Sequence, residues 1–287
     1  ISAASIAHDI VPLVRQVAYE TGNEVLNLFN LFVDSPELFP DFVHPSAAGA
    51  ARMAQRVYEH IQLETVADIK LLEGKPSNRF NFHGFEGLQF DFEGRDARVV
   101  QPKRVASGAP WVWRARFWGH EPQVDIALLE RGYHLVYCDV SEWFGNEKAL
   151  DIWNRFYQML TKAGLNPRSV MEGMSRGGVY VYRWAARHPD RIAAVYADAP
   201  VLDMKSWPGG KGNGVGSTED WQRFKIAFGL IDDAAAMAFR GNPVDLVGKI
   251  VEGGYPMLHV VGDADTVVPI TENTTVFAQR AHAAGGF

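Results

Sequence analysis

From residue 80 onward, short apolar runs alternate with longer stretches that place apolar side chains on one helical face. This alternation predicts an α/β fold with a mostly parallel sheet and helices on both of its faces. Two alternating runs flank Glu93-Gly94-Arg95 and predict an initial β-hairpin. The expected strands are 88–92, 97–100, 110–117, 133–140, 169–171, 191–198 and 257–261. The expected helices are 124–131, 148–163, 178–188 and 269–284.

The first 63 residues follow a different pattern. Their apolar spacing predicts a helix over 6–19, a short strand over 24–29 and a second helix over 46–61, which begins after Ser46 as its N-cap. Residues 64–79 are polar and contain glycine, proline and serine, which is typical of a linker. We therefore expect two units, 1–63 and 80–287.

The stretch Val170–Gly178 reads V-M-E-G-M-S-R-G-G and contains the pattern G-x-S-x-G with Ser175 at its centre. An apolar run precedes this pattern and a helical run follows it, which is the strand–turn–helix context that presents a nucleophilic serine. Gly173 and Gly177 fit a sharp turn, because we expect a Cβ there to collide with the neighbouring strand or helix. Free N–H groups at the helix start would stabilise an oxyanion. The alternative is a glycine-rich turn with a capping serine.

A hairpin followed by alternating strands and helices, with the serine turn midway, resembles the α/β-hydrolase fold. Residues 262–269, G-D-A-D-T-V-V-P, follow an apolar strand and resemble the G-x-x-D-x-x-V-P motif of that family. The aspartate of the motif orients the catalytic histidine, and the resemblance gives this role to Asp265, which follows Ser175 in the family's chain order. Asp203 is the alternative acid. Asp263 is expected to be a turn residue and Asp198 to be structural.

In the family, the histidine follows the acid by a helix, a strand and a loop. This chain ends at Phe287, after the helix alone. We therefore expect the base beyond Phe287, so that the hydrolase unit stops short of it. His282 on the last helix and His120 beside the oxyanion loop are the alternatives within the chain, and His120 is better suited to contact substrate.

An oxyanion hole needs two N–H donors. The resemblance assigns one to the backbone of Arg176, the residue after the nucleophile, and places the other within 114–119. The side chain of Arg176 either points toward substrate or pairs with a carboxylate of the protein itself; the sequence leaves both orientations open.

In the N-terminal unit, D-F-V-H-P at residues 41–45 precedes a helix that begins S-A-A-G-A. A D-x-x-H-P motif in this position resembles the C-terminal end of an SGNH (GDSL-type) hydrolase, and maps the triad aspartate and histidine of that family onto Asp41 and His44. The family usually has glycine where this chain has Phe42. Its nucleophile and oxyanion residues lie upstream of the motif, so we do not expect this unit to act alone. The alternative is a turn-capping aspartate beside an exposed loop histidine.

Composition narrows the function. A net charge of −6 without a basic run argues against non-specific nucleic-acid binding. Cys138 is the single cysteine, so the chain can form no internal disulfide, and its apolar surroundings indicate a buried position. No apolar run is long enough to span a bilayer. The His, Cys and acidic residues show no metal-ligand spacing, and the glycines of 209–216 lack the G-K-[ST] of a phosphate-binding loop, so we expect no metal or cofactor.

The second unit contains all eight tryptophans of the chain. We expect those in strands and helices to pack in the core, and Trp207, which precedes the glycine-rich loop, to line the substrate pocket.

These features predict a serine hydrolase that cleaves carboxylic esters through an acyl-serine intermediate. An SGNH segment joined to an α/β-hydrolase domain resembles bacterial carbohydrate esterases, so the resemblance favours a carbohydrate acyl or acetyl ester as the substrate. The alternatives are a peptidase of the prolyl-oligopeptidase type and a non-catalytic scaffold or binding domain.

Overall fold

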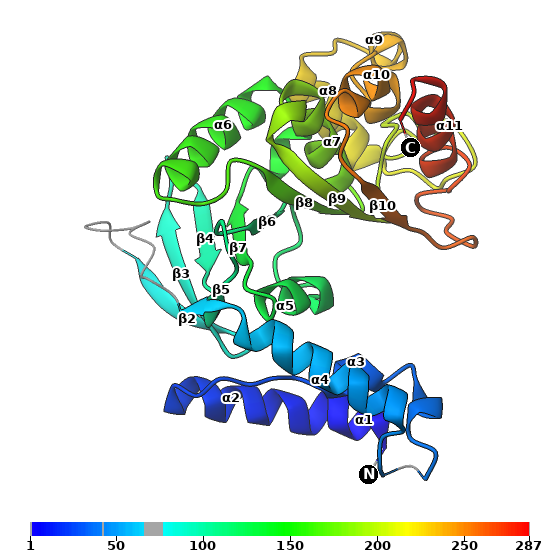
Figure 1. The fold of residues 1–287 in the computed structure, drawn as a ribbon. Coiled ribbons are helices and arrows are strands. Elements are labelled where there is room, and N and C mark those ends of the chain that lie inside the picture. Colours follow the sequence, from blue (N-terminus) through cyan, green and yellow to red (C-terminus); the bar gives the residue numbers. More distant parts are fainter. Residues whose placement is uncertain (1, 42, 66–76, 287) are drawn as a thin grey trace.

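The computed structural model describes residues 2–41, 43–65 and 77–286. Figure 1 shows a twisted sheet with helices packed against it and a separate layer of N-terminal helices below. The sheet has eight strands in the order β10-β9-β8-β6-β7-β4-β3-β2. Its strands are β2 (Asn78–Phe82), β3 (Phe85–Asp91), β4 (Asp96–Val100), β6 (Trp111–Arg114), β7 (His134–Cys138), β8 (Ser169–Met174), β9 (Ile192–Asp198) and β10 (Met257–Val260).

Strands β7, β6, β8, β9 and β10 pair in parallel, whereas β4, β3 and β2 extend the sheet as antiparallel strands beyond β7. The α/β prediction is confirmed, and the predicted hairpin corresponds to β3 and β4. Strand β2 was not expected, and its first two residues fall in the predicted linker. At the other end of that linker, β1 (Glu64–Thr65) pairs with β5 (Arg104–Val105). Residues 66–76 of the linker lie outside the described part.

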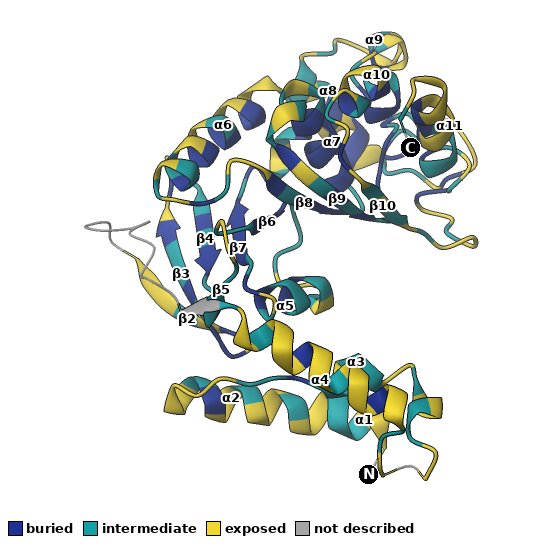
Figure 2. Cartoon of the chain, in the orientation of Figure 1, coloured by how far each residue is buried: buried dark blue, intermediate teal, exposed yellow. Residues whose placement is uncertain are grey.

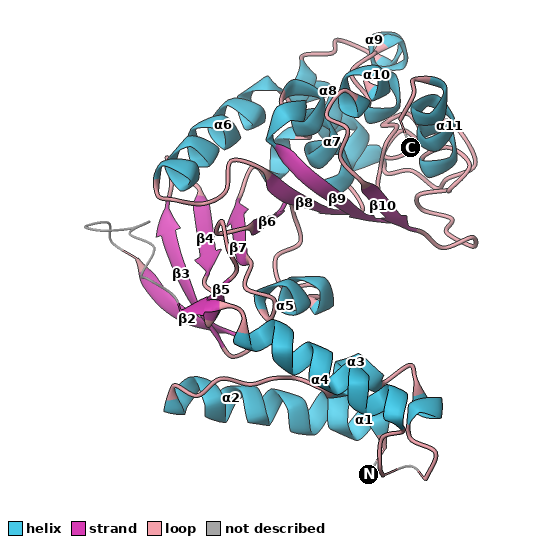
Figure 3. Ribbon diagram, viewed as in Figure 1, coloured by secondary structure: helices cyan, strands magenta, loops and turns pink. Residues whose placement is uncertain are grey.

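Helices cover both faces of the sheet (Figure 3). Helices α6 (Glu147–Lys162) and α7 (Gly177–Arg187) pack on one face, where α6 adds Trp153 and Phe156 to a core that also contains Trp111, Trp113 and Trp184. Helix α5 (Gln123–Leu129) packs on the other face against Val112 and Leu135. The remaining helices of this unit are α8 (Thr218–Phe228), α9 (Asp233–Ala238), α10 (Val247–Val251) and α11 (Thr274–Ala283), with short 3₁₀ turns at Ser141–Trp143, Pro189–Arg191 and Pro243–Asp245.

The tryptophans of strands and helices lie in the core, as expected; Trp111, Trp113, Trp153 and Trp184 are completely buried. Strands β6 and β7 are buried at every position, which is typical of parallel strands covered on both faces. Cys138 is buried in β7. Helix α11 is shorter than predicted, because residues 269–273 form turns before it begins at Thr274.

The N-terminal residues form a helical layer. Its elements are α1 (Ala3–Ser5), a π-helical turn (Ile6–Ile10), α2 (Val11–Thr21), α3 (Phe29–Phe32), a 3₁₀ turn (Pro36–Leu38) and α4 (Ala47–Ile61). Ser46 caps α4 by accepting the N–H of Gly49 at 3.2 Å, as predicted. The strand predicted over 24–29 is wrong. Residues 23–28 form neither helix nor strand, Leu28 has a helical backbone and α3 begins at Phe29; a strand would need a partner for its backbone groups.

The apolar stripe that predicted the first helix is largely exposed. Leu13 and Val17 are 66% and 58% exposed, and α2 buries Ala18 alone (Figure 2). The hydrophobic pattern therefore indicates the helix correctly, whereas the side chains in that pattern are not covered by the described residues.

The direction of winding reverses between β6 and β8. From β6 the chain passes through α5 to β7 on one side, and from β8 it passes through α7 to β9 and then to β10 on the other side. In open α/β sheets, ligands bind at the carboxyl ends of the strands at such a switch point. The loop after β6 and the turn after β8 meet there, so we expect a ligand site at these two segments.

The buried histidine of β7, His134, should make the stability of the fold depend on pH. Neither ring nitrogen of His134 has a hydrogen-bond partner among the described residues, and burial lowers its pKa to about 4. The ring titrates near 6.5 in the unfolded chain, so unfolding takes up a proton between pH 6.5 and 4. This contribution to stability is complete above pH 6.5 and is lost as the pH falls toward 4, up to about 3 kcal/mol.

His134→Gln should therefore flatten the decline of unfolding free energy between pH 6.5 and 4, measured by urea denaturation. His8→Gln, at an exposed position, is the control and should keep the wild-type slope. An unchanged slope in His134→Gln would show that His134 is already protonated in the folded protein.

Candidate active site

Ser175 lies in the turn between β8 and α7 with a φ of +49°. A side chain in this left-handed region costs about 1–3 kcal/mol, so the surrounding structure must hold it in place. The N–H of Ser175 donates to the carbonyl of Asp198 at 2.8 Å, and the carbonyl of Ser175 accepts the N–H groups of Gly178 at 3.0 Å and Val201 at 2.9 Å. The turn thus has the predicted strand before it and helix after it, and the end of β9 fixes its strained backbone.

Two glycines of this turn are required by close packing, but they are not the pair that the motif suggests. A Cβ on Gly173 would lie 2.9 Å from Cγ2 of Val181, and a Cβ on Gly178 would lie 2.6 Å from Cβ of Pro200. At Gly177 the nearest atom would be Cβ of Arg116 at 3.6 Å, which is an ordinary contact. The expected collision at Gly177 is therefore wrong, and Gly178 has that constraint instead.

The loop after β6 lies against the serine turn. The backbone nitrogen of Arg116 is 4.0 Å from the Cβ position of Gly177. Within the described ranges, the N–H groups of Arg116 and Arg176 donate no backbone hydrogen bond. Two N–H groups without a backbone acceptor therefore lie at the serine turn: that of Arg176 belongs to the turn, and that of Arg116 lies against Gly177. The N-terminal end of α7 adds its positive dipole, so this position can stabilise a developing negative charge.

The side chain of Arg176 pairs with the protein itself. Its two terminal nitrogens donate to the carboxylate of Asp220 at 3.1 and 3.4 Å, and its guanidinium lies 4.8 Å from the ring centroid of Trp207. Of the two orientations that the sequence left open, the structure has the ion pair. Trp207 is only 7% exposed, so it packs against Arg176 and presents little surface of its own.

The glycine-rich loop after β9 is hydrogen-bonded to the loop after β10. Lys211 N–H donates to the carbonyl of Lys205 at 2.9 Å, and the hydroxyl of Ser206 donates to Glu272 at 2.6 Å. Val215 N–H donates to the carbonyl of Thr266 at 3.2 Å. These bonds hold the glycine-rich loop against the segment that contains the predicted acid.

Asp265 follows β10 at the carboxyl edge of the sheet. One oxygen of its carboxylate accepts the N–H groups of Val267 at 2.8 Å and Val268 at 2.9 Å. No histidine of the described residues is hydrogen-bonded to it. The alternative acid, Asp203, accepts the N–H of Lys205 at 2.9 Å, and burial raises its pKa. Asp198 ends β9 and holds Ser175 through its carbonyl, in agreement with a structural role.

Neither His120 nor His282 is hydrogen-bonded to Ser175 in the described part of the chain. His120 is exposed, and its carbonyl accepts a hydrogen bond from Arg114. His282 is exposed on α11. No side-chain hydrogen bond of either histidine occurs within the described part of the chain.

The pair Asp41 and His44 lies in the N-terminal layer, which is separate from α7 (Figure 1). Nδ1 of His44 is 2.7 Å from Oδ2 of Asp41, and the side chains are 80% and 55% exposed. The backbone N–H of His44, and then its ring, hold the pKa of Asp41 at about 2. The two residues are therefore brought together with each other but not with Ser175. Phe42, where the SGNH motif usually has glycine, lies outside the described residues.

Sequence reasoning missed a buried ionic cluster beneath the serine turn. Arg114 ends β6, and its guanidinium donates to the carboxylates of Asp125 on α5 and Glu172 on β8. All three side chains are 5% exposed or less. The available signal was a charged residue inside each of two otherwise apolar runs, W-V-W-R-A and V-M-E-G.

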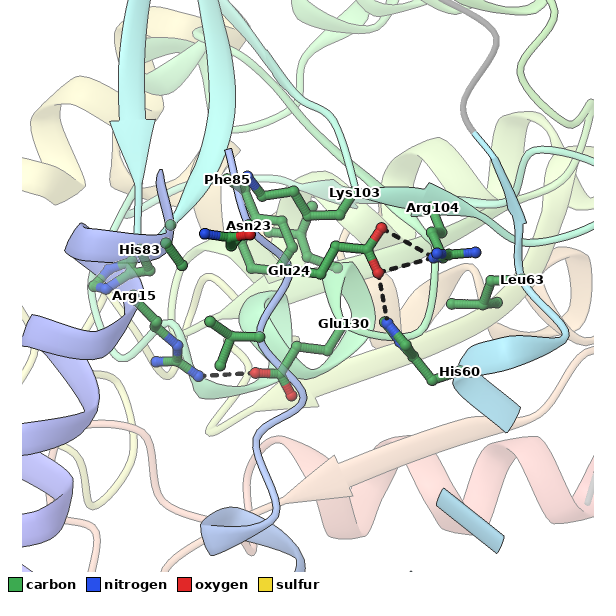
Figure 4. Close-up of a pocket in the computed structure, with 14 residues that line it drawn as sticks. Arg15, Asn23, Glu24, His60, Leu63, His83, Phe85, Lys103, Arg104 and Glu130 are labelled. Atoms are coloured by element: carbon green, nitrogen blue, oxygen red, sulfur yellow. Dashed lines mark hydrogen bonds and ion pairs between the residues drawn. The ribbon is translucent and has the colours of Figure 1, made fainter. Parts of the chain in front are cut away.

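A cavity elsewhere joins the N-terminal layer to the sheet unit (Figure 4). There the carboxylate of Glu24 accepts from Arg104 at 2.8 Å and lies 3.1 Å from Nε2 of His60, while Arg15 donates to Glu130 at 2.9 Å. The enclosed space is about 20 Å³, which holds about one water. These charges are paired within the protein, so we interpret the cavity as a packed interface. It lies at the amino end of β7, away from the carboxyl edge that holds Ser175.

Among the residues that the structure describes, no three His, Cys, Asp or Glu side chains are grouped so that they could hold a metal ion. Within the same residues, the longest apolar helices fall short of what crossing a bilayer requires.

Comparison with known proteins shows the fold. No family model matches this chain, and no curated protein matches its sequence. Among solved structures, it is similar to dipeptidyl peptidase 4 of Porphyromonas gingivalis, with a TM-score of 0.51 and 15% identity over 74% of this chain and 31% of that one. It is also similar to acylaminoacyl peptidase of Pyrococcus horikoshii, with a TM-score of 0.50 and 18% identity over 74% of this chain and 35% of that one.

A third similar structure is Est1E from Butyrivibrio proteoclasticus, with a TM-score of 0.50 and 20% identity over 68% of this chain and 84% of that one. This chain spans about a third of the length of the two peptidases. The sheet unit has the α/β-hydrolase fold.

The contacts at the serine turn predict opposite outcomes for two adjacent glycines. Gly178→Ala should lower the free energy of unfolding by about 1–3 kcal/mol, because its Cβ would overlap Pro200 and force the turn to shift. Gly177→Ala, the matched control, should change it by less than about 0.5 kcal/mol, because the site has room. Urea unfolding at pH 7 measures both, and equal losses would contradict the packing described here.

Proposed function

We propose that this protein is a serine hydrolase that cleaves carboxylic esters through an acyl-serine intermediate. The observation that carries the proposal is Ser175 in a strained turn beside two open backbone N–H groups, those of Arg116 and Arg176. A serine on such a turn, with N–H donors at the turn, is the arrangement used for attack on a carbonyl carbon next to an oxyanion hole, which supports the proposal.

In the proposed mechanism, Oγ of Ser175 attacks the ester carbonyl, and the carbonyl oxygen becomes an anion held by the N–H groups of Arg116 and Arg176. A histidine oriented by Asp265 takes the hydroxyl proton and returns it to the leaving alcohol. Water then attacks the acyl-serine and releases the acid. The guanidinium of Arg176 does not face the reacting atoms in this scheme, because Asp220 and Trp207 hold it.

For the N-terminal unit, 1–63, we propose descent from an SGNH hydrolase. The support is the D-x-x-H-P motif together with the hydrogen-bonded pair of Asp41 and His44, in which Nε2 of the histidine is left for another partner. An SGNH unit next to an α/β-hydrolase unit, 80–287, favours a carbohydrate acyl or acetyl ester as the substrate. In this scheme, His120 is a candidate substrate contact on the exposed loop before α5.

A peptidase is the second candidate function. It is favoured by the likeness of the fold to dipeptidyl peptidase 4 and acylaminoacyl peptidase. Both candidates use Ser175 in the same role, so they differ in the bond that is cleaved and not in the nucleophile.

A fluorophosphonate probe should modify Ser175 in the native protein, because Oγ of an activated serine displaces fluoride from phosphorus, and the two N–H groups would hold the phosphoryl oxygen of the resulting ester. Mass spectrometry of the peptide that spans 169–178 identifies the modified residue. Ser175→Ala should abolish the labelling, and Ser141→Ala is the control that should retain it. A folded protein that includes the histidine oriented by Asp265 and still remains unlabelled would exclude the hydrolase and favour a scaffold.

Asp265→Asn should lower kcat by about 10⁴-fold, because the amide no longer orients the imidazole or stabilises its charged form. The neighbouring Asp263→Asn is the matched control and should keep wild-type activity. Hydrolysis of an acetylated xylo-oligosaccharide and of a dipeptidyl anilide measures both variants and separates the two candidate functions. A large loss in Asp203→Asn instead would move the acid to the loop after β9, and faster cleavage of the anilide would favour the peptidase.

A further inference from the structure

The guanidinium of Arg114 holds the loop that supplies the proposed oxyanion donor. Nε donates to the carbonyls of Arg116 at 3.2 Å and Phe117 at 3.0 Å, and Nη2 donates to the carbonyl of His120. Three carbonyls of the loop 116–120 therefore point at one buried cation. Hydrogen bonds with a charged donor are about twice as strong as neutral ones, so these bonds favour a single conformation of the loop.

This loop needs such a restraint because its backbone is strained. Phe117 has a φ of +54° and Glu121 a φ of +45°, both in the left-handed region that side chains other than glycine avoid. The bond from Arg114 to the carbonyl of Phe117 acts on the strained residue itself. Without it, we expect the peptide between Arg116 and Phe117 to relax, and the N–H of Arg116 to move with it.

The other side of the guanidinium connects the loop to the rest of the site. Nη1 donates to Asp125, in the first turn of α5, and to Glu172 at 3.0 Å. Glu172 lies on β8, three residues before Ser175. A single side chain therefore links the loop after β6, the helix that follows it and the strand that leads to the nucleophile.

The charges of this cluster balance if Glu172 is protonated. Desolvation and the neighbouring Asp125 carboxylate raise the pKa of Glu172 well above its usual value. The cluster then contains one cation, one anion and one neutral acid, which is a combination that a protein can bury without an unpaired charge. The ionic tether is therefore between Arg114 and Asp125, and Glu172 acts as a neutral acceptor.

We infer that Arg114 is a positioning residue for the oxyanion hole: its guanidinium fixes the loop 116–120 so that the N–H of Arg116 points at the oxyanion formed on Ser175. The inference rests on the proposed function. A donor N–H contributes to catalysis only when it is aimed at the oxyanion, and removal of one such donor costs about 10²–10³-fold in rate.

Arg114→Lys tests the inference because it keeps the positive charge but loses the branched guanidinium. A lysine ammonium cannot donate to all three loop carbonyls and both carboxylates at once. Glu172→Gln is the matched control, since the amide has the shape and charge of the protonated acid. Hydrogen–deuterium exchange reports on the backbone amides of 115–121. The rate of fluorophosphonate labelling and the affinity for an alkyl boronic acid, which forms a tetrahedral adduct with the serine, both report on the oxyanion hole. The affinity for the matching carboxamide, which stays planar, reports on binding without that adduct.

Arg114→Lys should exchange faster over 115–121, label about 10–100-fold more slowly and lose boronate affinity by a similar factor, with carboxamide affinity kept within about two-fold. Glu172→Gln should match the wild type in all four measurements. Equal loss of boronate and carboxamide affinity would overturn the inference, because it would show a general structural role. Unchanged exchange over 115–121 would also overturn it.

Two further outcomes are distinguishable. If the wild type neither labels nor binds boronate, the proposed function fails, while the exchange comparison still decides whether Arg114 fixes the loop. If Arg114→Lys does not fold, Arg114→Gln combined with Asp125→Asn takes its place, because it removes the guanidinium and leaves no unpaired buried charge. Wild-type exchange in that variant would again overturn the inference.

Discussion

The site depends on the left-handed backbone of Ser175. At a φ of +49°, the hydroxyl is presented at the carboxyl edge of the sheet instead of continuing along β8. This conformation costs free energy, which the fold offsets with the bond from Ser175 N–H to the carbonyl of Asp198 and with two bonds to the Ser175 carbonyl. The register of β8 against β9 places Met174 opposite Asp198, so sheet pairing delivers that acceptor where the turn begins. The position of Ser175, the proposed nucleophile, is thus a consequence of strand register.

The second constraint lies on the other side of the switch point. The loop after β6 also has left-handed residues, and it is held by the guanidinium of Arg114 instead of by a neighbouring strand. The serine turn and the loop after β6 therefore both contain strained backbone. Hydrogen bonds to the end of β9 hold the first, and a buried ion cluster holds the second. A rigid scaffold beneath strained loops is the arrangement that preorganised N–H donors require.

Local pattern predicted the features that depend on neighbours in sequence. Seven of the eight strands of the sheet, the main helices and the serine turn follow from apolar spacing and from G-x-S-x-G, because each is specified within about fifteen residues. Features that depend on distant partners were not predictable in this way. Gly178 rather than Gly177 is constrained because Pro200 lies against it, and the partner of Arg176 is Asp220, 44 residues away.

The strand predicted over 24–29 shows the same limit, since its apolar residues fit a strand but no partner lies beside it in the described structure. For the buried cluster, the charged residues Arg114 and Glu172 inside apolar runs were a visible signal. Their pairing could be recognised only from the topology, because β6 and β8 are adjacent in the sheet while α5, β7 and α6 separate them along the chain. Charged residues that interrupt predicted buried strands are therefore candidates for ion pairs with one another.

We propose that the N–H groups of Arg116 and Arg176 hold the oxyanion formed on Ser175. The most direct measurement is a crystal structure of the protein after Ser175 has reacted with a fluorophosphonate. The account predicts a phosphoryl oxygen within about 2.7–3.1 Å of both backbone nitrogens. A phosphoryl oxygen that points to solvent, or that is bound by other donors while these two N–H groups stay open, would contradict it.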